Sequence, residues 1–227
     1  MDLIPVIDLL QGQVVRGMQG NRSAYRSIVS ALCGSSAPVT VAQILCEYSA
    51  ARQLYVADLD ALQGGAVQGE TLQQILAALP GIELWLDAGF ADIAPARALV
   101  AELGPRVVPV YASESLRSPE ALARCTGSSQ AILSLDRREG RRMDPAGAWD
   151  RPALWPRRVI VMTLERVGAG TGPDLETLRE VAALQPESQL IGAGGIASEA
   201  DLIRAGDAGA SAWLVASALH DLRLPHR

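Results

Sequence analysis

The stretch IPVIDLLQGQVVRG (residues 4–17) contains the pattern from which the fold can be predicted. Its apolar run ends at Asp8, and a glycine follows four residues later. The stretch AILSLDRREGRRM (residues 131–143) repeats this pattern, because its apolar run ends at Asp136 and a glycine again follows four residues later. The interior of a strand favours apolar side chains. The two carboxylates therefore mark the ends of strands and are candidate functional groups.

Eight short apolar runs, each expected to form a strand, alternate with helical segments along the chain. The expected strands are residues 3–8, 53–58, 82–87, 106–111, 130–136, 158–163, 188–193 and 211–215. Apolar residues recur with a period near ~3.6 in the segments expected to form helices, which are residues 41–51, 71–79, 93–103, 118–125, 174–184 and 198–206. The Pro-rich residues 144–155 fit a helix poorly. This alternation predicts a parallel sheet, and eight units predict a closed (β/α)8 barrel, the TIM-barrel architecture, with a doubly wound open sheet as the alternative.

The 227 residues are expected to form one domain, built from two similar half-barrels. A length near ~250 residues is typical of one such barrel, and no linker or low-complexity tract interrupts the chain. Asp8 and Asp136 begin equivalent stretches that are 136 − 8 = 128 residues apart. Two further pairs of segments align, LDAGFAD (86–92) with GAGGIAS (192–198) and VYAS (110–113) with LVAS (214–217).

The composition excludes several classes of function. The net charge is −5 and the pI about 5.1, whereas nucleic-acid-binding proteins usually carry a basic face. The chain has no lysine, so Schiff-base chemistry on a lysine amine is excluded. No metal site is expected, because the histidines are few and the cysteines lack metal-site or redox-motif spacing; these residues are His220, His226, Cys33, Cys46 and Cys125. Acid–base chemistry would then depend on carboxylates, and the cysteines are expected to be free thiols.

The sequence also lacks the features of a membrane or secreted protein. No apolar run approaches the ~18 residues that span a bilayer, and no basic region precedes the first apolar run. We therefore expect no membrane partner and a cytoplasmic location. The oligomeric state does not follow from the sequence.

In a (β/α)8 barrel, functional side chains lie at the carboxyl ends of the strands. Four expected strands end in an acid, at Asp8, Asp58, Asp87 and Asp136. Strands one and five lie opposite each other in an eight-stranded barrel, so Asp8 and Asp136 are expected to face each other across its mouth. Two such carboxylates can act as general acid and general base on one substrate. The alternative is a structural role, in which the acids cap loops or pair with Arg16.

The glycine-rich stretch GAGGIAS is expected to bind phosphate. It ends the seventh expected strand, where Gly194 and Gly195 let the backbone approach a ligand closely. Ser198 is expected to cap the next helix, whose N-terminus favours anions. The loops after strands seven and eight are also the usual phosphate site of these barrels. The alternative is a plain tight turn.

Five motifs, in order along essentially the whole chain, resemble the HisA/HisF histidine-biosynthesis barrel family. They are IPVIDLLQGQVVRGMQG, VADLDALQGG, LSLD, GAGTGPDL and GAGGIAS. VVRGMQG and DLDALQGG are more similar to HisA, the ProFAR isomerase. The resemblance implies an Amadori rearrangement of an aminoaldose to an aminoketose, with Asp8 as the base, Asp136 as the acid, and no cofactor or metal. Arg16, within the first motif, is counted among the substrate-binding candidates.

Several positions depart from the family pattern. The Gly-Arg expected at strand eight is replaced by Ala216 and Ser217, which we still expect to bind phosphate. A Gly-Gly-Gly-Ile-Arg-like stretch in the first half is replaced by DAGFAD, in which Asp87 would repel a phosphate or contact a substrate amine instead. Ser113 remains as a polar group in the first-half site. Thr163 stands where the family has a threonine followed by an acid, so a group that helps to hold the substrate is lost or shifted.

Three functional hypotheses follow, and each involves a small phosphorylated ligand. The first is a HisA-like sugar-phosphate isomerase that acts on ProFAR or a close analogue. The second is a HisA-like enzyme with a different, singly phosphorylated substrate in one-carbon carrier biosynthesis, in the methanopterin or methanofuran pathway. The third is a phosphate-ligand-binding subunit without turnover. The third predicts that Asp8→Asn and Asp136→Asn leave function intact.

Overall fold

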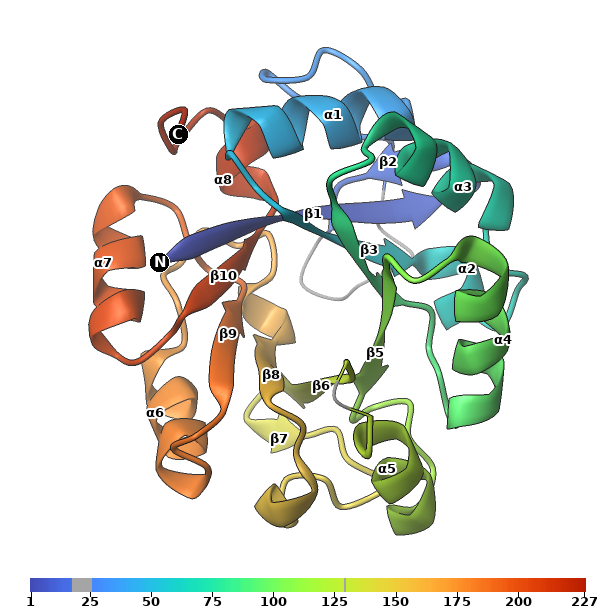
Figure 1. Cartoon of the computed structure of the whole chain (residues 1–227). Helices are drawn as coiled ribbons and strands as arrows, with labels where there is room; N and C mark the ends of the chain where they lie inside the picture. The colour runs from blue at the N-terminus through green and yellow to red at the C-terminus, as the bar shows by residue number, and fades with distance from the viewer. Residues whose placement is uncertain (18–25, 129) are drawn as a thin grey trace.

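Eight parallel strands close into a barrel in the computed structural model, which describes residues 1–17, 26–128 and 130–227 (Figure 1). The strands are β1 (Asp2–Leu10), β3 (Gln53–Asp58), β4 (Glu83–Asp87), β5 (Val107–Ala112), β6 (Ile132–Arg138), β8 (Arg158–Thr163), β9 (Gln189–Ala193) and β10 (Ala212–Val215). Neighbours in this order pair in parallel, and β10 pairs with β1 to close the barrel, with Asp2 opposite Ala212. The predicted (β/α)8 barrel is confirmed, and this closure excludes the open sheet.

A short antiparallel strand follows the first barrel strand of each half. β2 (Gln13–Val15) pairs with β1, and β7 (Arg141–Arg142) pairs with β6. Both hairpins turn through two residues with positive φ, which favours glycine at the second position. The values are 50° and 75° at Gln11 and Gly12, and 50° and 72° at Glu139 and Gly140. The glycine four residues after each aspartate therefore belongs to a hairpin turn at the end of the strand.

Helices cover the outside of the barrel (Figure 1). The longer ones are α1 (Pro38–Tyr48), α3 (Gly69–Ala78), α4 (Ile93–Leu103), α5 (Pro119–Thr126), α6 (Leu175–Leu184) and α7 (Glu199–Asp207). Single turns are α2 (Leu59–Leu62), α8 (Ser217–His220) and the 3₁₀ turns η2 (Pro152–Leu154) and η3 (Leu164–Arg166). Ser118, Asp174 and Ser198 fix the starts of α5, α6 and α7, because each side chain accepts a hydrogen bond from a backbone N–H three residues on. The expectation that Ser198 caps a helix is confirmed.

Apolar side chains form two layers of core. The inner layer fills the barrel and includes Ile4 of β1, Trp85 of β4 and Ile132 of β6. Their neighbours along the strands, such as Leu3 and Leu133, pack outward in the layer that contains the helices. Successive strand residues face opposite sides. The position of a residue within its strand therefore decides whether its side chain can reach the mouth of the barrel.

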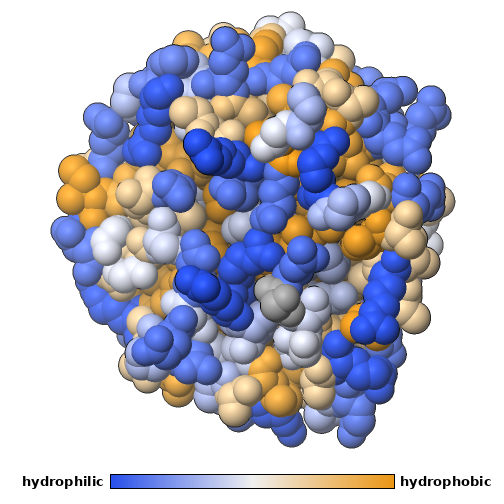
Figure 2. All heavy atoms as spheres, viewed as in Figure 1, coloured by the Kyte–Doolittle hydropathy of each residue, from blue (hydrophilic) through white to orange (hydrophobic). Residues whose placement is uncertain are grey.

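Cys33, Cys46 and Cys125 are buried free thiols, as predicted. Hydrophilic residues predominate over the centre of the face shown in Figure 2, with apolar residues in small groups between them. Across the described residues, no helix has the length and apolar character needed to cross a membrane.

Candidate active site

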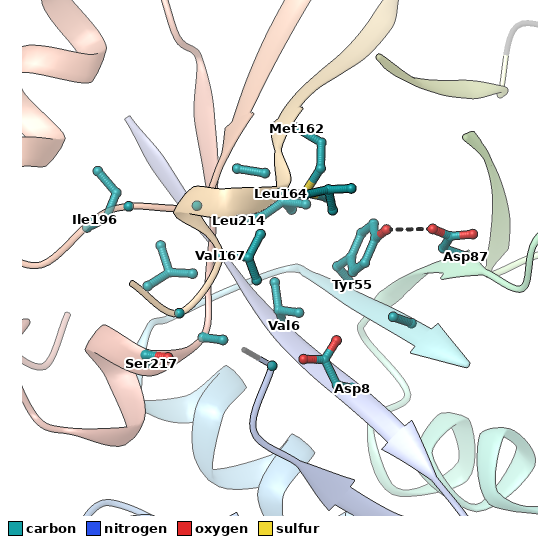
Figure 3. Close-up of a pocket in the computed structure, with 18 of the residues that line it drawn as sticks. Val6, Asp8, Tyr55, Asp87, Met162, Leu164, Val167, Ile196, Leu214 and Ser217 are labelled. Atoms are coloured by element: carbon teal, nitrogen blue, oxygen red, sulfur yellow. Dashed lines mark hydrogen bonds between the residues drawn. The ribbon is translucent and has the colours of Figure 1, made fainter. Parts of the chain in front are cut away.

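A pocket opens at the carboxyl ends of the barrel strands (Figure 3). Closure of the barrel brings together side chains from both halves of the chain. Seven of the residues predicted to form the site line this pocket: Asp8, Asp87, Asp136, Gly194, Gly195, Ala216 and Ser217.

Asp8 stands on the inner face of β1, in line with Ile4 and Val6, and is partly exposed in the pocket. The chain passes close to its carboxylate just after β2. A Cβ atom added to Gly17 would lie 2.6 Å from Asp8 Oδ2. Any side chain at residue 17 would therefore displace this carboxylate, so the glycine allows the backbone to pack directly against Asp8.

Asp136 stands on the opposite side of the barrel. β6 is four strands away from β1 in either direction around the ring. The Asp136 side chain is only 4% exposed. Ser134 Oγ donates a hydrogen bond to its Oδ1 at 2.7 Å, and the Glu114 backbone N–H donates to its Oδ2 at 3.2 Å. The two aspartates therefore face a common pocket from opposite strands, which is the geometry expected for an acid and a base acting on one ligand.

The environment of Asp136 favours its protonated form. Burial raises the pKa of Asp136 to about 8, and the nearby charges of Glu114 and Asp87 act in the same direction. The hydrogen bonds from Ser134 and from the Glu114 backbone act against this shift. A carboxylic acid that keeps its proton near neutral pH can donate it to a ligand.

Asp87 ends β4 and is tied to its surroundings by two donors. The Tyr55 hydroxyl donates to Oδ2 at 3.0 Å, and the Gly89 backbone N–H donates to Oδ1 at 3.1 Å. Burial, followed by the charge of Asp87, raises the pKa of Tyr55 well above its usual value, so the hydroxyl remains a donor. Figure 3 shows this pair at one end of the pocket, away from Ser217 and Ile196.

The glycine-rich end lies on the other side of the pocket. Gly194 and Gly195 have φ values of 86° and 85°, which glycine adopts without strain. A Cβ atom on Gly195 would lie 2.0 Å from the Gly172 carbonyl oxygen, so the loops are packed closely. The Gly195 N–H donates to the Arg166 carbonyl at 2.9 Å and is already used within the protein. The Gly195 N–H is therefore not available to a ligand, whereas the Ser217 side chain also lies at this end of the pocket.

Three residues predicted to bind substrate do not line the pocket. Arg16 forms an ion pair with Asp221, with Nη2 and Oδ1 2.6 Å apart, and so joins the end of β2 to the end of α8. The Thr163 hydroxyl faces away from the barrel and donates to Asp174 Oδ2 at 2.8 Å, while its neighbour Met162 lines the pocket. These contacts favour structural roles for Arg16 and Thr163.

The third such residue, Ser113, lies beneath Asp136. Its side chain is fully buried, and its Oγ accepts the Asp136 backbone N–H at 2.8 Å. The same Oγ lies 3.1 Å from Asp136 Oδ2. Ser113 is therefore placed to orient the aspartate rather than to contact a phosphate. Asp58, the remaining strand-end acid, is also structural, because it accepts hydrogen bonds from the backbone of Ala61 and Gln68.

Sequence reasoning did not single out Tyr55 or Glu114 as residues of the site. Both line the pocket, and Tyr55 stands on the inner face of β3. Tyr55 lies two residues before Ala57 in an otherwise apolar strand, so the two side chains lie on the same face of that strand. This spacing was the signal for Tyr55. Glu114 follows β5 directly and had no comparable signal. Among the described residues, no three His, Cys, Asp or Glu side chains are grouped so as to hold a metal ion.

The fold places this protein among the (β/α)8 barrels, and carboxylates on opposite strands line the pocket at its mouth. Comparison with known sequences then gives its family. Residues 2–225 match the model of the family described as "Histidine biosynthesis protein", and the chain belongs to this family.

Several relatives are similar over nearly their whole length. An uncharacterized protein of Methanocaldococcus jannaschii is 27% identical over 227 residues, covering 97% of this chain and 93% of the relative. A protein of Thermomicrobium roseum is 29% identical, covering 99% of this chain and 94% of the relative. A protein of Halothermothrix orenii is 26% identical, covering 99% and 97%. The last two are named 1-(5-phosphoribosyl)-5-((5-phosphoribosylamino)methylideneamino) imidazole-4-carboxamide isomerase, the ProFAR isomerase.

Proposed function

We propose that this protein is an aldose–ketose isomerase that rearranges ProFAR or a close analogue, with Asp136 as general acid and Asp8 as general base. The observation that carries the proposal is the placement of both carboxylates in one pocket, on opposite strands of the barrel. The raised pKa of Asp136 supports its role as the acid. The family and the names of the relatives support the reaction class.

The rearrangement requires only proton transfers. Asp136 gives its proton to the ring oxygen of the aminoaldose, the bond between that oxygen and C1 breaks, and the nitrogen lone pair forms a double bond to C1. Asp8 then removes the proton from C2, the electron pair of that bond forms a C1–C2 double bond, and the electrons of the C1–N double bond return to the nitrogen. Return of a proton to C1 and loss of the C2 hydroxyl proton give the aminoketose, so atoms and electrons balance within one substrate molecule.

The first test is the turnover of ProFAR by the purified protein, followed by absorbance. Asp8→Asn and Asp136→Asn keep the size of each side chain but remove the proton-transfer group. We expect each variant to lose about 10²–10⁴-fold in rate, the usual contribution of a positioned acid or base.

Asp207→Asn is the matched control, because it removes the same charge from the exposed last turn of α7. It should retain the wild-type rate. If both site variants also retain it, the acid–base proposal is wrong. If wild type shows no turnover above that of the two site variants, a ligand-binding subunit without turnover becomes the better account. The link to one-carbon carrier biosynthesis stays a prediction from the sequence.

A further inference from the structure

The two ends of the pocket come from equivalent segments of the two halves but differ in chemistry. In the alignment of residues 86–92 with 192–198, Asp87 corresponds to Ala193. In the alignment of residues 110–113 with 214–217, Ser113 corresponds to Ser217. The backbones remain similar, since Gly89 and its counterpart both have positive φ, and each segment ends in a residue that caps a helix. The difference between the ends therefore lies in their side chains.

The first-half end is the end of the pocket that contains Asp87. There the Asp87 carboxylate occupies the hydrogen-bond donors that an anionic ligand would need. Asp87 is 7% exposed, and its two oxygens accept from the Gly89 N–H and the Tyr55 hydroxyl. Neither donor is then free to bind a ligand phosphate. Ala193, the counterpart of Asp87, lines the other end and offers no charge.

The equivalent serines, Ser113 and Ser217, differ in whether a ligand can reach them. Ser113 is fully buried and is engaged by Asp136 and by the Met143 carbonyl, which accepts its hydroxyl at 2.9 Å. Its counterpart Ser217 begins α8 and lines the pocket. Only one of the two equivalent hydroxyls can therefore reach a ligand.

The charges facing the first-half end add to this asymmetry. Among the described residues, the acids Asp87 and Glu114 line the pocket there beside the protonated Asp136, together with the cation Arg138. A phosphate placed against Asp87 would meet a buried carboxylate at short range, where like charges repel most strongly because little water screens them. The repulsion is weaker at the glycine-rich end, where the lining residues Ala193, Gly194 and Gly195 are uncharged.

We propose that Asp87 is a specificity-determining residue that excludes phosphate from the first-half end, so that the substrate carries a single phosphate, bound at the end formed by Gly194 and Ser217. The inference rests on the proposed function and narrows its substrate class. The native substrate is then an aminoaldose phosphate whose far end is uncharged or cationic.

The experiment compares ProFAR with the two analogues that each lack one of its phosphates, by isothermal titration calorimetry on the full chain. ProFAR and each analogue differ only by one phosphate, so a difference in Kd reports on that group. We expect at least one analogue to bind wild type about tenfold or more tightly than ProFAR, as expected for relief of a close like-charge contact. Asp87→Asn should reduce this ratio to near one by improving the binding of ProFAR.

Tyr55→Phe and Asp207→Asn serve as controls. Tyr55→Phe removes the hydrogen bond but keeps the charge of Asp87, so the ratio should persist; Asp207→Asn removes a charge outside the pocket and should also leave the ratio unchanged. Asp87→Ser is a second neutral variant in case Asp87→Asn fails to fold.

The inference is overturned if wild type binds ProFAR as tightly as both analogues, if neutral variants keep the ratio, or if none of the three compounds binds. Binding needs no turnover, so failure of the isomerase proposal appears in the rate assay and failure of this inference in the titration.

Discussion

At the scale of single residues, Asp136 and His220 illustrate how burial controls a proton. Burial raises the pKa of Asp136 to about 8, so that the carboxyl keeps its proton, and it lowers the pKa of His220 to about 4, so that the imidazole stays neutral. Asp136 faces the pocket. His220 is the last residue of α8 and lies beside Ser30, Cys33, Arg16 and Asp221. The two titrations should therefore have separate consequences, one for the rate and one for stability.

The rate should fall at high pH because Asp136 must be protonated to act as the acid. Below about pH 8 the acid is present, and above it the value of kcat/KM should fall by about tenfold per pH unit. The measurement is a pH–rate profile between pH 6 and 10. A profile that stays flat across this range would show that Asp136 is not the acid.

Stability should fall at acid pH because of His220. The folded pKa of about 4 lies below the unfolded value of 6.5, so the unfolded state binds more protons between these values and stability is lost as the pH falls through them. The loss should reach about 3 kcal/mol at most. Thermal melts between pH 4 and 7 test this, with His220→Gln as comparison, since that variant cannot titrate. Parallel curves for the two proteins would contradict the assignment.

At the scale of elements, the β1–β2 hairpin positions Asp8, and Gly17 should be critical for activity. A methyl group there would contact Asp8 Oδ2, so Gly17→Ala should lower kcat by about 10–100-fold through displacement of the carboxylate. Gly12→Ala is the matched control in the same hairpin. Gly12 has positive φ but open space around it, so alanine should cost about 1 kcal/mol of stability and leave kcat unchanged. Equal kcat in both variants would refute this role for Gly17.

The alternation of side chains along each strand explains which predictions the structure supports. Asp8 and Asp136 were placed in the pocket by their position at strand ends, and they also lie on the inner faces of β1 and β6. Thr163 and Asp58 end strands too, but both face outward and bond to helix starts. Both faces of these strands are apolar, so the inward and outward positions that separate these cases became visible only in the structure.

At the scale of the whole molecule, the alternation of strands and helices was enough to predict the closed barrel, and the aligned segments indicated its two halves. The contact between Tyr55 and Asp87 was not predictable in the same way, because it depends on how far each side chain reaches between neighbouring strands. The pairing of Arg16 with Asp221 was also missed, since it joins distant parts of the chain that meet only where β10 closes against β1. Sequence patterns thus identified the elements and several pocket residues, whereas contacts that depend on closure required the structure.

The measurement that tests the central claim most directly is the conversion of an aminoaldose phosphate to an aminoketose, observed by ¹³C nuclear magnetic resonance with the label at C2 of the rearranging ribose. It follows the bond changes themselves and applies equally to ProFAR and to singly phosphorylated analogues. We predict that wild type moves the C2 signal from the region of alcohols to that of ketones, and that Asp8→Asn and Asp136→Asn do so at least about 10²-fold more slowly. An unchanged signal with all of these substrates, or equal conversion by the variants, would contradict the account.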